Sequence, residues 1–195
     1  MALLDTVLFD EYRERLRQLL IERAYEKRQV VLASGAQSGY YFDCKQASLS
    51  GEGHFLIGQL FGHMMTQIEA DEKTKHLACA GMSIGADPLC SSLSLTCHLN
   101  QRTLDAVYVR KEAKTHGTAS YLEGTKLLPP NAPILLLEDV ITTGGSTLTA
   151  FEHVKAGGFE VKHVLALIDR DAGGADNLAK AGLSFHPIFH LRDFQ

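Results

Sequence analysis

Hydrophobic and polar positions near the start of the chain follow two different periods. Apolar residues recur every three or four positions between charged ones over about residues 5–27, which predicts an amphipathic covering helix. Two short β-prone runs follow, at residues 30–35 and 40–42. Together these two runs predict a small hairpin-like layer.

From residue 51 onward, helical and strand patterns alternate. Helices are expected over residues 53–70, 85–98 and 145–156, and strands over residues 77–80, 104–109, 134–137 and 161–168. A short helix and a terminal strand are expected to complete residues 172–195, and the polar stretch 111–125 is expected to form a long loop or ribbon. Strands that alternate with helices indicate an α/β fold with a parallel sheet.

Composition narrows the class of protein. The chain has 195 residues, of which 45% are hydrophobic and 22% charged, so we expect one globular domain with a sizeable core. The formal net charge of −4 gives no basic surface for nucleic acid. No apolar run approaches the roughly 20 residues of a membrane span, and the first residues lack the pattern of a secretion signal. We therefore expect a cytoplasmic protein that binds neither membranes nor nucleic acid.

Four cysteines occur without any CxxC spacing. Cys90 and Cys97 lie at the spacing of the buried side of a helix, and the alternative is half of a metal site with His98. A chain of this size needs no disulfide bonds to fold, so we expect all four cysteines to be reduced.

The most informative segment is residues 134–147, ILLLEDVITTGGST. A buried strand leads through Glu138 and Asp139 into a turn of glycines and hydroxyl residues that opens a helix. Backbone N–H groups of such a turn bind phosphate without a lysine. The two carboxylates would repel a phosphate, so we expect them to face neutral hydroxyl groups or a metal ion. A phosphorylated ribose satisfies both requirements.

Two alternatives remain open for this segment. Phosphoacceptor signalling domains also carry an acidic pair after an apolar strand, although theirs follows the first strand of the fold. The turn could also be only a connection from strand to helix, because many such turns contain glycine and threonine. Other phosphate loops are excluded, since neither GxxxxGK[ST] nor a GxGxxG after a strand is present.

A second segment, RKEAKTH at residues 110–116, concentrates positive charge in a net-acidic chain. Arg110, Lys111 and Lys114, with His116 when it is protonated, form a local binding site for an anion. Gly117 and Thr118 allow the backbone to hinge there. The alternative is an ordinary solvated loop.

These segments resemble those of one enzyme family. Residues 134–147 resemble the phosphoribosyl diphosphate (PRPP) signature of type I phosphoribosyltransferases, and RKEAKTHG at residues 110–117 resembles the catalytic loop of orotate phosphoribosyltransferases. Residues 34–43 resemble that family's N-terminal nucleobase segment. Residues 80–88, with Asp169 and Arg170, match two more of its motifs in the expected order. The likeness spans about residues 30–171.

The resemblance implies a type I phosphoribosyltransferase fold, with a parallel-sheet core flanked by helices and a small hood. Residues 1–195 would form a single domain, with the core at about 50–170 and the hood from about 1–45 plus the C-terminal segment. The implied reaction transfers the 5-phosphoribosyl group from PRPP to orotate, giving orotidine 5'-phosphate and pyrophosphate in pyrimidine biosynthesis. Also implied are Mg²⁺ bound mainly through PRPP, with no assigned protein ligand, and a homodimer that shares the 110–118 loop across subunits.

The resemblance also assigns roles to residues. Catalytic roles fall to Lys114, His116 and Asp139. PRPP contacts fall to Arg110, Lys111, Lys114, His116, Glu138, Asp139, Val140, Ile141, Thr142, Thr143, Gly144, Gly145, Ser146 and Thr147. Orotate contacts fall to Tyr41, Phe42, Thr142 and Arg170, with Asp43 and Lys45 as further candidates. Asp87 is expected to orient the amides of Ser83, Ile84 and Gly85 toward pyrophosphate.

One position departs from the family pattern, because Ala33 stands where the family often has a lysine. The histidines other than His116 show no metal-ligand spacing and are expected to be structural or exposed. Two other functions share the PRPP signature. One is a purine-salvage phosphoribosyltransferase, which differs in its nucleobase pocket, and the other is a regulator that binds PRPP without turnover.

Overall fold

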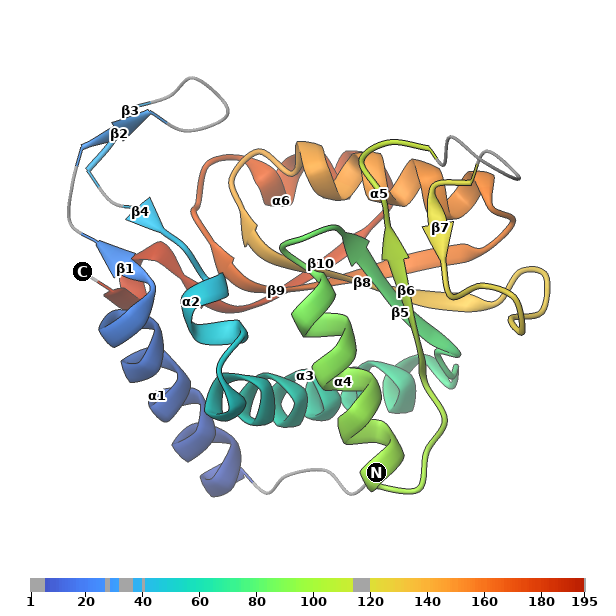
Figure 1. Ribbon diagram of the computed structural model, residues 1–195, viewed down its shortest axis with the longest axis horizontal. Helices are drawn as coiled ribbons and strands as arrows, with labels where there is room; N and C mark the ends of the chain where they lie inside the picture. The colour runs from blue at the N-terminus through green and yellow to red at the C-terminus, as the bar shows by residue number, and fades with distance from the viewer. Residues whose placement is uncertain (1–5, 27–28, 32–36, 40, 114–119, 195) are drawn as a thin grey trace.

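A six-stranded sheet forms the centre of the computed structural model, which describes residues 6–26, 29–31, 37–39, 41–113 and 120–194 (Figure 1). Its strands run in the order β10 (Ser184–His190), β9 (Glu160–Asp169), β8 (Pro133–Ile141), β5 (Ala78–Met82), β6 (Asp105–Val109) and β7 (Leu122–Glu123). All neighbours are parallel except β7, which is antiparallel to β6. The predicted α/β class with a mostly parallel sheet is therefore confirmed.

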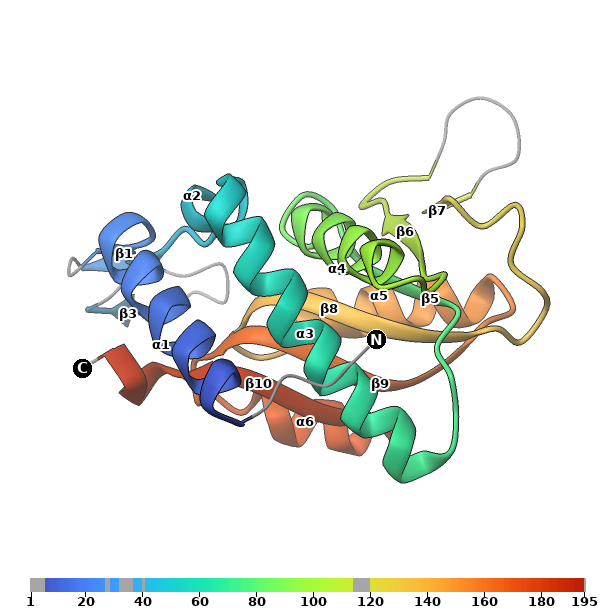
Figure 2. The same ribbon diagram turned by 90° about the horizontal axis from the view of Figure 1, so that it is seen from below.

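Helices cover both faces of this sheet (Figures 1 and 2). The first face carries α1 (Thr6–Arg23), α3 (Gly51–Glu72) and α4 (Asp87–Leu99), and the second carries α5 (Gly145–Ala156) and α6 (Gly174–Lys180). The short α2 (Lys45–Ser48) lies against α1, α3 and α4, and the 3₁₀ helix η1 (Leu191–Phe194) follows β10. The sheet therefore separates two hydrophobic cores.

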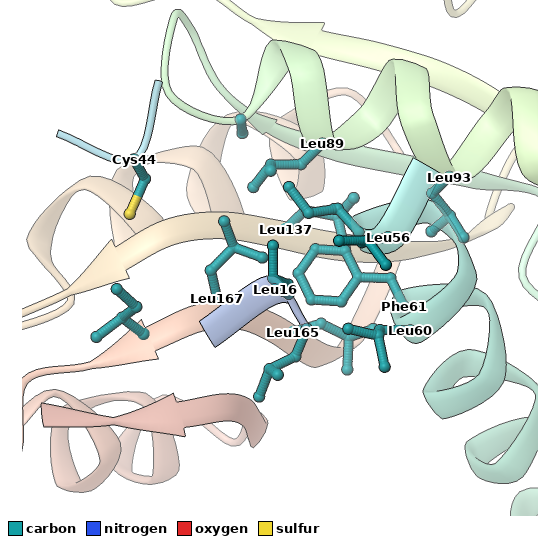
Figure 3. Packing of buried hydrophobic residues seen from close by; sticks show 14 of the residues in the cluster. Leu16, Cys44, Leu56, Leu60, Phe61, Leu89, Leu93, Leu137, Leu165 and Leu167 are labelled. Carbon is teal, nitrogen blue, oxygen red and sulfur yellow. The ribbon is translucent and has the colours of Figure 1, made fainter. Parts of the chain in front are cut away.

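The apolar run of β8 serves both cores. Leu135 and Leu137 contribute to the core under α3, while Ile134 and Leu136 contribute to the core under α5. In the first core the ring of Phe61 from α3 is fully buried among leucines of α1, α3 and the sheet (Figure 3). Burial on both faces is why this strand reads as a continuous apolar segment rather than an alternating one.

The N-terminal strands pair differently from the hairpin that the sequence predicts. β4 (Tyr41–Phe42) pairs with β1 (Tyr25–Glu26), whereas β2 (Val30–Val31) pairs with β3 (Gln37–Ser38). The expectation that 40–42 belongs with the run 30–35 is thus wrong. The Phe42 ring packs 5.1 Å from the Tyr25 ring and 5.0 Å from the Phe194 ring, so aromatic contacts accompany the observed pairing.

Several element boundaries also differ from the predicted ones. α1 ends at Arg23 rather than near residue 27, because the next residues form the β1–β4 pair. β8 continues to Ile141, so the acidic pair lies inside the strand and not in the turn after it. There, Glu138 is in register with Ala166 of β9, which supplies the pairing that sequence alone does not reveal.

Among the described helices, none combines the length and the apolar character that crossing a bilayer requires. The four cysteines, Cys44, Cys79, Cys90 and Cys97, are all buried and free of disulfide bonds. Cys90 and Cys97 lie on the buried side of α4, as predicted.

Candidate active site

A cavity of about 700 Å³ opens at the carboxyl ends of the central strands. Its lining comes from the ends of β5, β6 and β8, the start of α5, and α2. The residues are Lys45, Met82, Ser83, Ile84, Gly85, Arg110, Lys111, Glu112, Glu138, Asp139 and Ser146. β5 and β8 lie side by side, and the chain continues outward from them in opposite directions along the sheet. Ligands of open α/β sheets bind in the crevice at such a reversal.

The turn between β8 and α5 is built to present backbone amides. Gly144 is the N-cap residue of α5, adopts a φ of 81°, and contributes no side chain that caps the helix. The first N–H groups of a helix have no partner within the helix and carry its positive dipole end. From α6, the Asn177 amide donates a hydrogen bond of 3.0 Å to the Thr143 carbonyl, which braces the turn. No motif in the sequence indicated Asn177.

Glu138 is a buried carboxyl group at the floor of this cavity. Only 6% of the residue is exposed, and the Thr147 hydroxyl donates a hydrogen bond of 2.9 Å to Glu138 Oε2. Burial, and then the adjacent negative charge of Asp139, raise the pKa of Glu138 to about 8. The free protein at neutral pH therefore holds Glu138 largely protonated, able to donate a hydrogen bond to a hydroxyl group.

Asp139 is half-buried, and its Oδ1 accepts a hydrogen bond of 2.8 Å from the backbone N–H of Val140. Its carboxylate lies against Gly85, where a Cβ atom would come within 2.9–3.0 Å of the carboxylate atoms. A Cβ at Gly81 would collide with Ala86 and with the Leu137 carbonyl. Glycine at both positions lets the loop after β5 fold closely against the end of β8.

The loop after β5 is held by hydrogen bonds at both of its ends. Ser83 donates its backbone N–H to the Val109 carbonyl at 2.8 Å, and its hydroxyl to Asp87 Oδ1 at 2.8 Å. A cis peptide bond joins Ser83 to Ile84. Asp87, which the resemblance assigns to orienting this loop, therefore contacts it through the Ser83 hydroxyl.

The cationic segment is described only in part. Arg110 and Lys111 lie in the cavity lining, and Arg110 Nη1 forms an exposed ion pair of 3.2 Å with Glu123. Exposed pairs of this kind contribute little stability, so Arg110 can exchange Glu123 for an anionic ligand. Lys114 and His116, together with the hinge candidates Gly117 and Thr118, lie outside the described residues.

Of the residues assigned to the nucleobase, Lys45 belongs to the cavity lining given above, whereas Tyr41, Phe42, Asp43, Thr142 and Arg170 lie outside it. Tyr41 and Thr142 are half-buried, whereas Phe42 is buried in the aromatic contacts with Tyr25 and Phe194. Arg170 is 9% exposed, and burial lowers the pKa of its guanidinium.

The remaining PRPP candidates follow β8 into the turn. The side chain of Val140 packs against the first core and that of Ile141 lies in the second core. Thr143, Gly145 and Ser146 are exposed, whereas Gly144 is buried.

One group that sequence reasoning missed lies at the ends of β9 and β10. Asp169, Asp171 and His190 bring ligand atoms within 4.8 Å of one another and could hold a metal ion. Hydrogen bonds within the group explain why these side chains lie close together without a metal ion. His190 Nδ1 lies 2.8 Å from Asp171 Oδ1, and the backbone N–H of Asp171 donates a hydrogen bond of 2.9 Å to Asp169 Oδ1. Parallel register between β9 and β10, which no spacing in the sequence reveals, brings His190 opposite Asp169.

Two known relatives of this chain in sequence carry the same name. No protein-family model matches the chain. The orotate phosphoribosyltransferase of Sorangium cellulosum is 47% identical over 182 residues, which cover 93% of this chain and 92% of the relative. This chain belongs to the orotate phosphoribosyltransferase family. The orotate phosphoribosyltransferase of a Nostoc strain is 38% identical over 183 residues, covering 94% of this chain and 85% of that relative.

Solved structures of orotate phosphoribosyltransferases share the fold. The Mycobacterium tuberculosis enzyme in complex with Fe(III) dicitrate has a TM-score of 0.77 and 32% identity, covering 94% of this chain and 98% of that one. The complex of the M. tuberculosis enzyme with PRPP has a TM-score of 0.73 and 30% identity over the same shares of the two chains. The resemblance seen in the sequence and the type I phosphoribosyltransferase fold are thus confirmed.

Proposed function

We propose that this chain transfers the 5-phosphoribosyl group from PRPP to orotate, giving orotidine 5'-phosphate and pyrophosphate in pyrimidine biosynthesis. The observation that carries the proposal is the continuous path from the acidic pair of β8 through the glycine turn into α5, at the edge of a cavity in a member of the orotate phosphoribosyltransferase family. A solved orotate phosphoribosyltransferase with this fold binds PRPP.

The turn 142–147 holds the 5'-phosphate of PRPP. Backbone N–H groups at the start of α5 and the hydroxyls of Thr142, Thr143 and Ser146 supply the hydrogen bonds. Glu138 and Asp139 meet the two ribose hydroxyls, because a protonated Glu138 can donate to one oxygen while Asp139 accepts from the other. This division of roles keeps the carboxylate of Asp139 away from the phosphate.

The leaving group needs positive charge and oriented donors on the other side of the cavity. The amides of residues 83–85 and the cations Arg110 and Lys111 stabilise the pyrophosphate as the C1–O bond breaks and the pyrophosphate oxygen takes the electron pair of that bond. N1 of orotate then forms the new bond to C1 from the opposite face and releases its proton to solvent, so no covalent enzyme intermediate is required. Lys114 and His116 complete the charge as catalytic residues in the 110–118 loop of the neighbouring subunit, which makes the working enzyme a homodimer.

Mg²⁺ is proposed as the cofactor. The described cavity lining offers carboxylate and hydroxyl oxygens, the ligands that this ion prefers, and Asp139 is the half-buried carboxylate among them. These residues fit the ion, which would be held mainly through the diphosphate of PRPP. When bound, it supplies neutralisation of the diphosphate charge.

Orotate is held at the N-terminal side of the cavity. Tyr41 and Phe42 lie next to the planar base, Thr142 hydrogen-bonds it, and the Arg170 guanidinium binds its carboxylate or carbonyl oxygens. The proposal also includes a cytoplasmic location and a single domain. The hood of this domain combines about residues 1–45 with the C-terminal segment. The aromatic contacts that join Tyr25, Phe42 and Phe194 support that hood.

One assay tests the reaction against its rivals. Purified protein with Mg²⁺ and PRPP is offered orotate, hypoxanthine, adenine or uracil, and both pyrophosphate and nucleotide are measured. Of the four bases, we expect only orotate to give both products. Turnover of hypoxanthine or adenine instead would identify a purine-salvage enzyme, and PRPP binding without turnover would identify a regulator.

A further inference from the structure

Lys45 brings a cation into the cavity from a part of the chain outside the sheet. It is the first residue of α2, which follows β4 and lies beside α4 in Figure 1. Of the described residues that line the cavity, it alone precedes α3 in the chain. It shares the cavity with Asp139, with the loop 83–85, and with Arg110 and Lys111.

A half-buried carboxylate fixes the position of this ammonium group. Lys45 Nζ lies 2.7 Å from Asp43 Oδ1, and the other oxygen of Asp43 accepts a hydrogen bond of 3.1 Å from Gln46 Nε2. The backbone N–H of Asp43 donates to the Ala24 carbonyl at 2.9 Å, which ties this segment to the end of α1. The Lys45 side chain is 41% exposed, so the ammonium remains accessible to a ligand while Asp43 holds it.

The charge around Lys45 keeps it protonated. Its hydrogen bond with Asp43 raises the pKa of Lys45, with a smaller contribution from Asp139, and the same contact lowers the pKa of Asp43. Across the cavity, Arg110 is already paired with Glu123. A substrate that enters with several negative charges meets the carboxylate of Asp139, and a nearby lysine offsets that repulsion as a compact point charge.

We propose that Lys45 is a substrate-binding residue that contacts an anionic oxygen in this cavity, belonging to the diphosphate of PRPP or to the carboxylate of orotate, and that Asp43 is its positioning residue. This inference rests on the proposed function. It adds a residue from α2 to a cavity whose other described lining cations, Arg110 and Lys111, follow β6.

Steady-state kinetics with the purified enzyme test the role of Lys45. Lys45→Met keeps the length of the side chain and removes the charge, whereas Lys45→Arg keeps the charge. We expect Lys45→Met to raise the KM of one substrate about tenfold, because it loses one partly exposed charged hydrogen bond. The KM values of Lys45→Arg should stay within about twofold of wild type. Lys180→Met, on the exposed end of α6, is the matched control and should leave both KM values unchanged.

The substrate affected identifies the source of the anionic oxygen. A higher KM for PRPP, with weaker binding of Mg-pyrophosphate in calorimetry, assigns Lys45 to the diphosphate. A higher KM for orotate alone assigns it to the carboxylate. If Lys45→Met has wild-type thermal stability and both KM values lie within about twofold of wild type, the proposal is overturned.

Asp43→Asn tests the positioning role separately. We expect it to raise the same KM by less than Lys45→Met does, and the double variant to be no worse than Lys45→Met, because both changes act through one ammonium group. Additive effects would overturn the positioning role of Asp43. If the wild-type protein forms no orotidine 5'-phosphate, the proposed function fails, and calorimetry of wild type and Lys45→Met with Mg-pyrophosphate and with orotate still decides whether Lys45 binds an anion.

Discussion

The carboxyl group of Glu138 makes the stability of the free enzyme depend on pH in a direction opposite to that of an ion-paired acid, whose pKa is lowered in the folded state. Burial and the neighbouring Asp139 raise its pKa from 4.5 to about 8. In the unfolded chain the group returns to its ordinary pKa, so between about pH 4.5 and 8 the folded state binds more protons than the unfolded state. The contribution of Glu138 to stability is therefore fully present below pH 4.5 and is lost as the pH rises through 8.

The size of this effect follows from the two pKa values. Each pH unit inside the window removes up to about 1.4 kcal/mol, so the step from about pH 5 to 8 removes roughly 3–4 kcal/mol from the free energy of unfolding. This is a large share of the roughly 5–15 kcal/mol that stabilises a typical domain. His63 and His186 act in the opposite direction, because burial lowers the pKa of both below 6.5. Their contribution is present above pH 6.5 and is lost as the pH falls below 6.5 and through the lowered pKa of the folded state.

Glu138→Gln separates the contribution of Glu138 from those of the histidines. Glutamine has the shape of a protonated glutamate, can still accept the hydrogen bond from the Thr147 hydroxyl, and carries no charge at any pH. Urea unfolding of both proteins, without substrate and at one protein concentration, should show the variant gaining roughly 3–4 kcal/mol on wild type between about pH 5 and 8. Parallel stability curves across this range would refute the protonated state of Glu138.

Three further predictions concern the core, the cavity and the shared loop. Phe61→Ala removes the buried ring at the centre of the first core and should lower the free energy of unfolding by about 3–5 kcal/mol in urea titrations, and a loss below about 1 kcal/mol would contradict that packing. Gly85→Ala should lower kcat/KM about tenfold or more, because the added Cβ presses on the Asp139 carboxylate. Gly51→Ala is the control, since a Cβ there meets nothing within 4 Å, and it should leave kcat/KM unchanged. Equal activities of the two variants would contradict the close approach of Gly85 to Asp139. Lys114→Ala should reduce kcat by about 10²-fold or more. When this variant is mixed with the inactive Asp139→Asn variant, hybrid dimers should recover up to about a quarter of wild-type activity if each active site takes its loop from the neighbouring subunit. No recovery would argue against shared sites.

The parts of the site that the sequence predicts well are contiguous in the chain. The path from β8 through the turn into α5 spans residues 133–156, and the predicted helix 145–156 has the observed bounds. Strand and helix periods, turn glycines and hydroxyl residues all act over a few neighbouring positions here. The buried strand was predicted to end four residues too early, because Glu138 and Asp139 interrupt the apolar pattern although β9 still pairs with this part of β8.

Residues that join the site from distant segments could not be predicted in this way. No motif indicates Asn177, which reaches the Thr143 carbonyl from α6. Lys45 is a candidate only through the family resemblance, and its entry into the cavity from α2 depends, like the contact of Asn177, on how the helices pack onto the sheet. The raised pKa of Glu138 has the same origin, since burial of its carboxyl group requires the completed sheet and the start of α5. Sequence motifs therefore locate the phosphosugar turn, whereas the charge state of its acidic pair and the cation opposite it are properties of the folded chain. That distinction makes Glu138 and Lys45 the most direct tests of the structure, because a protein that carried the motifs without this packing would show neither effect.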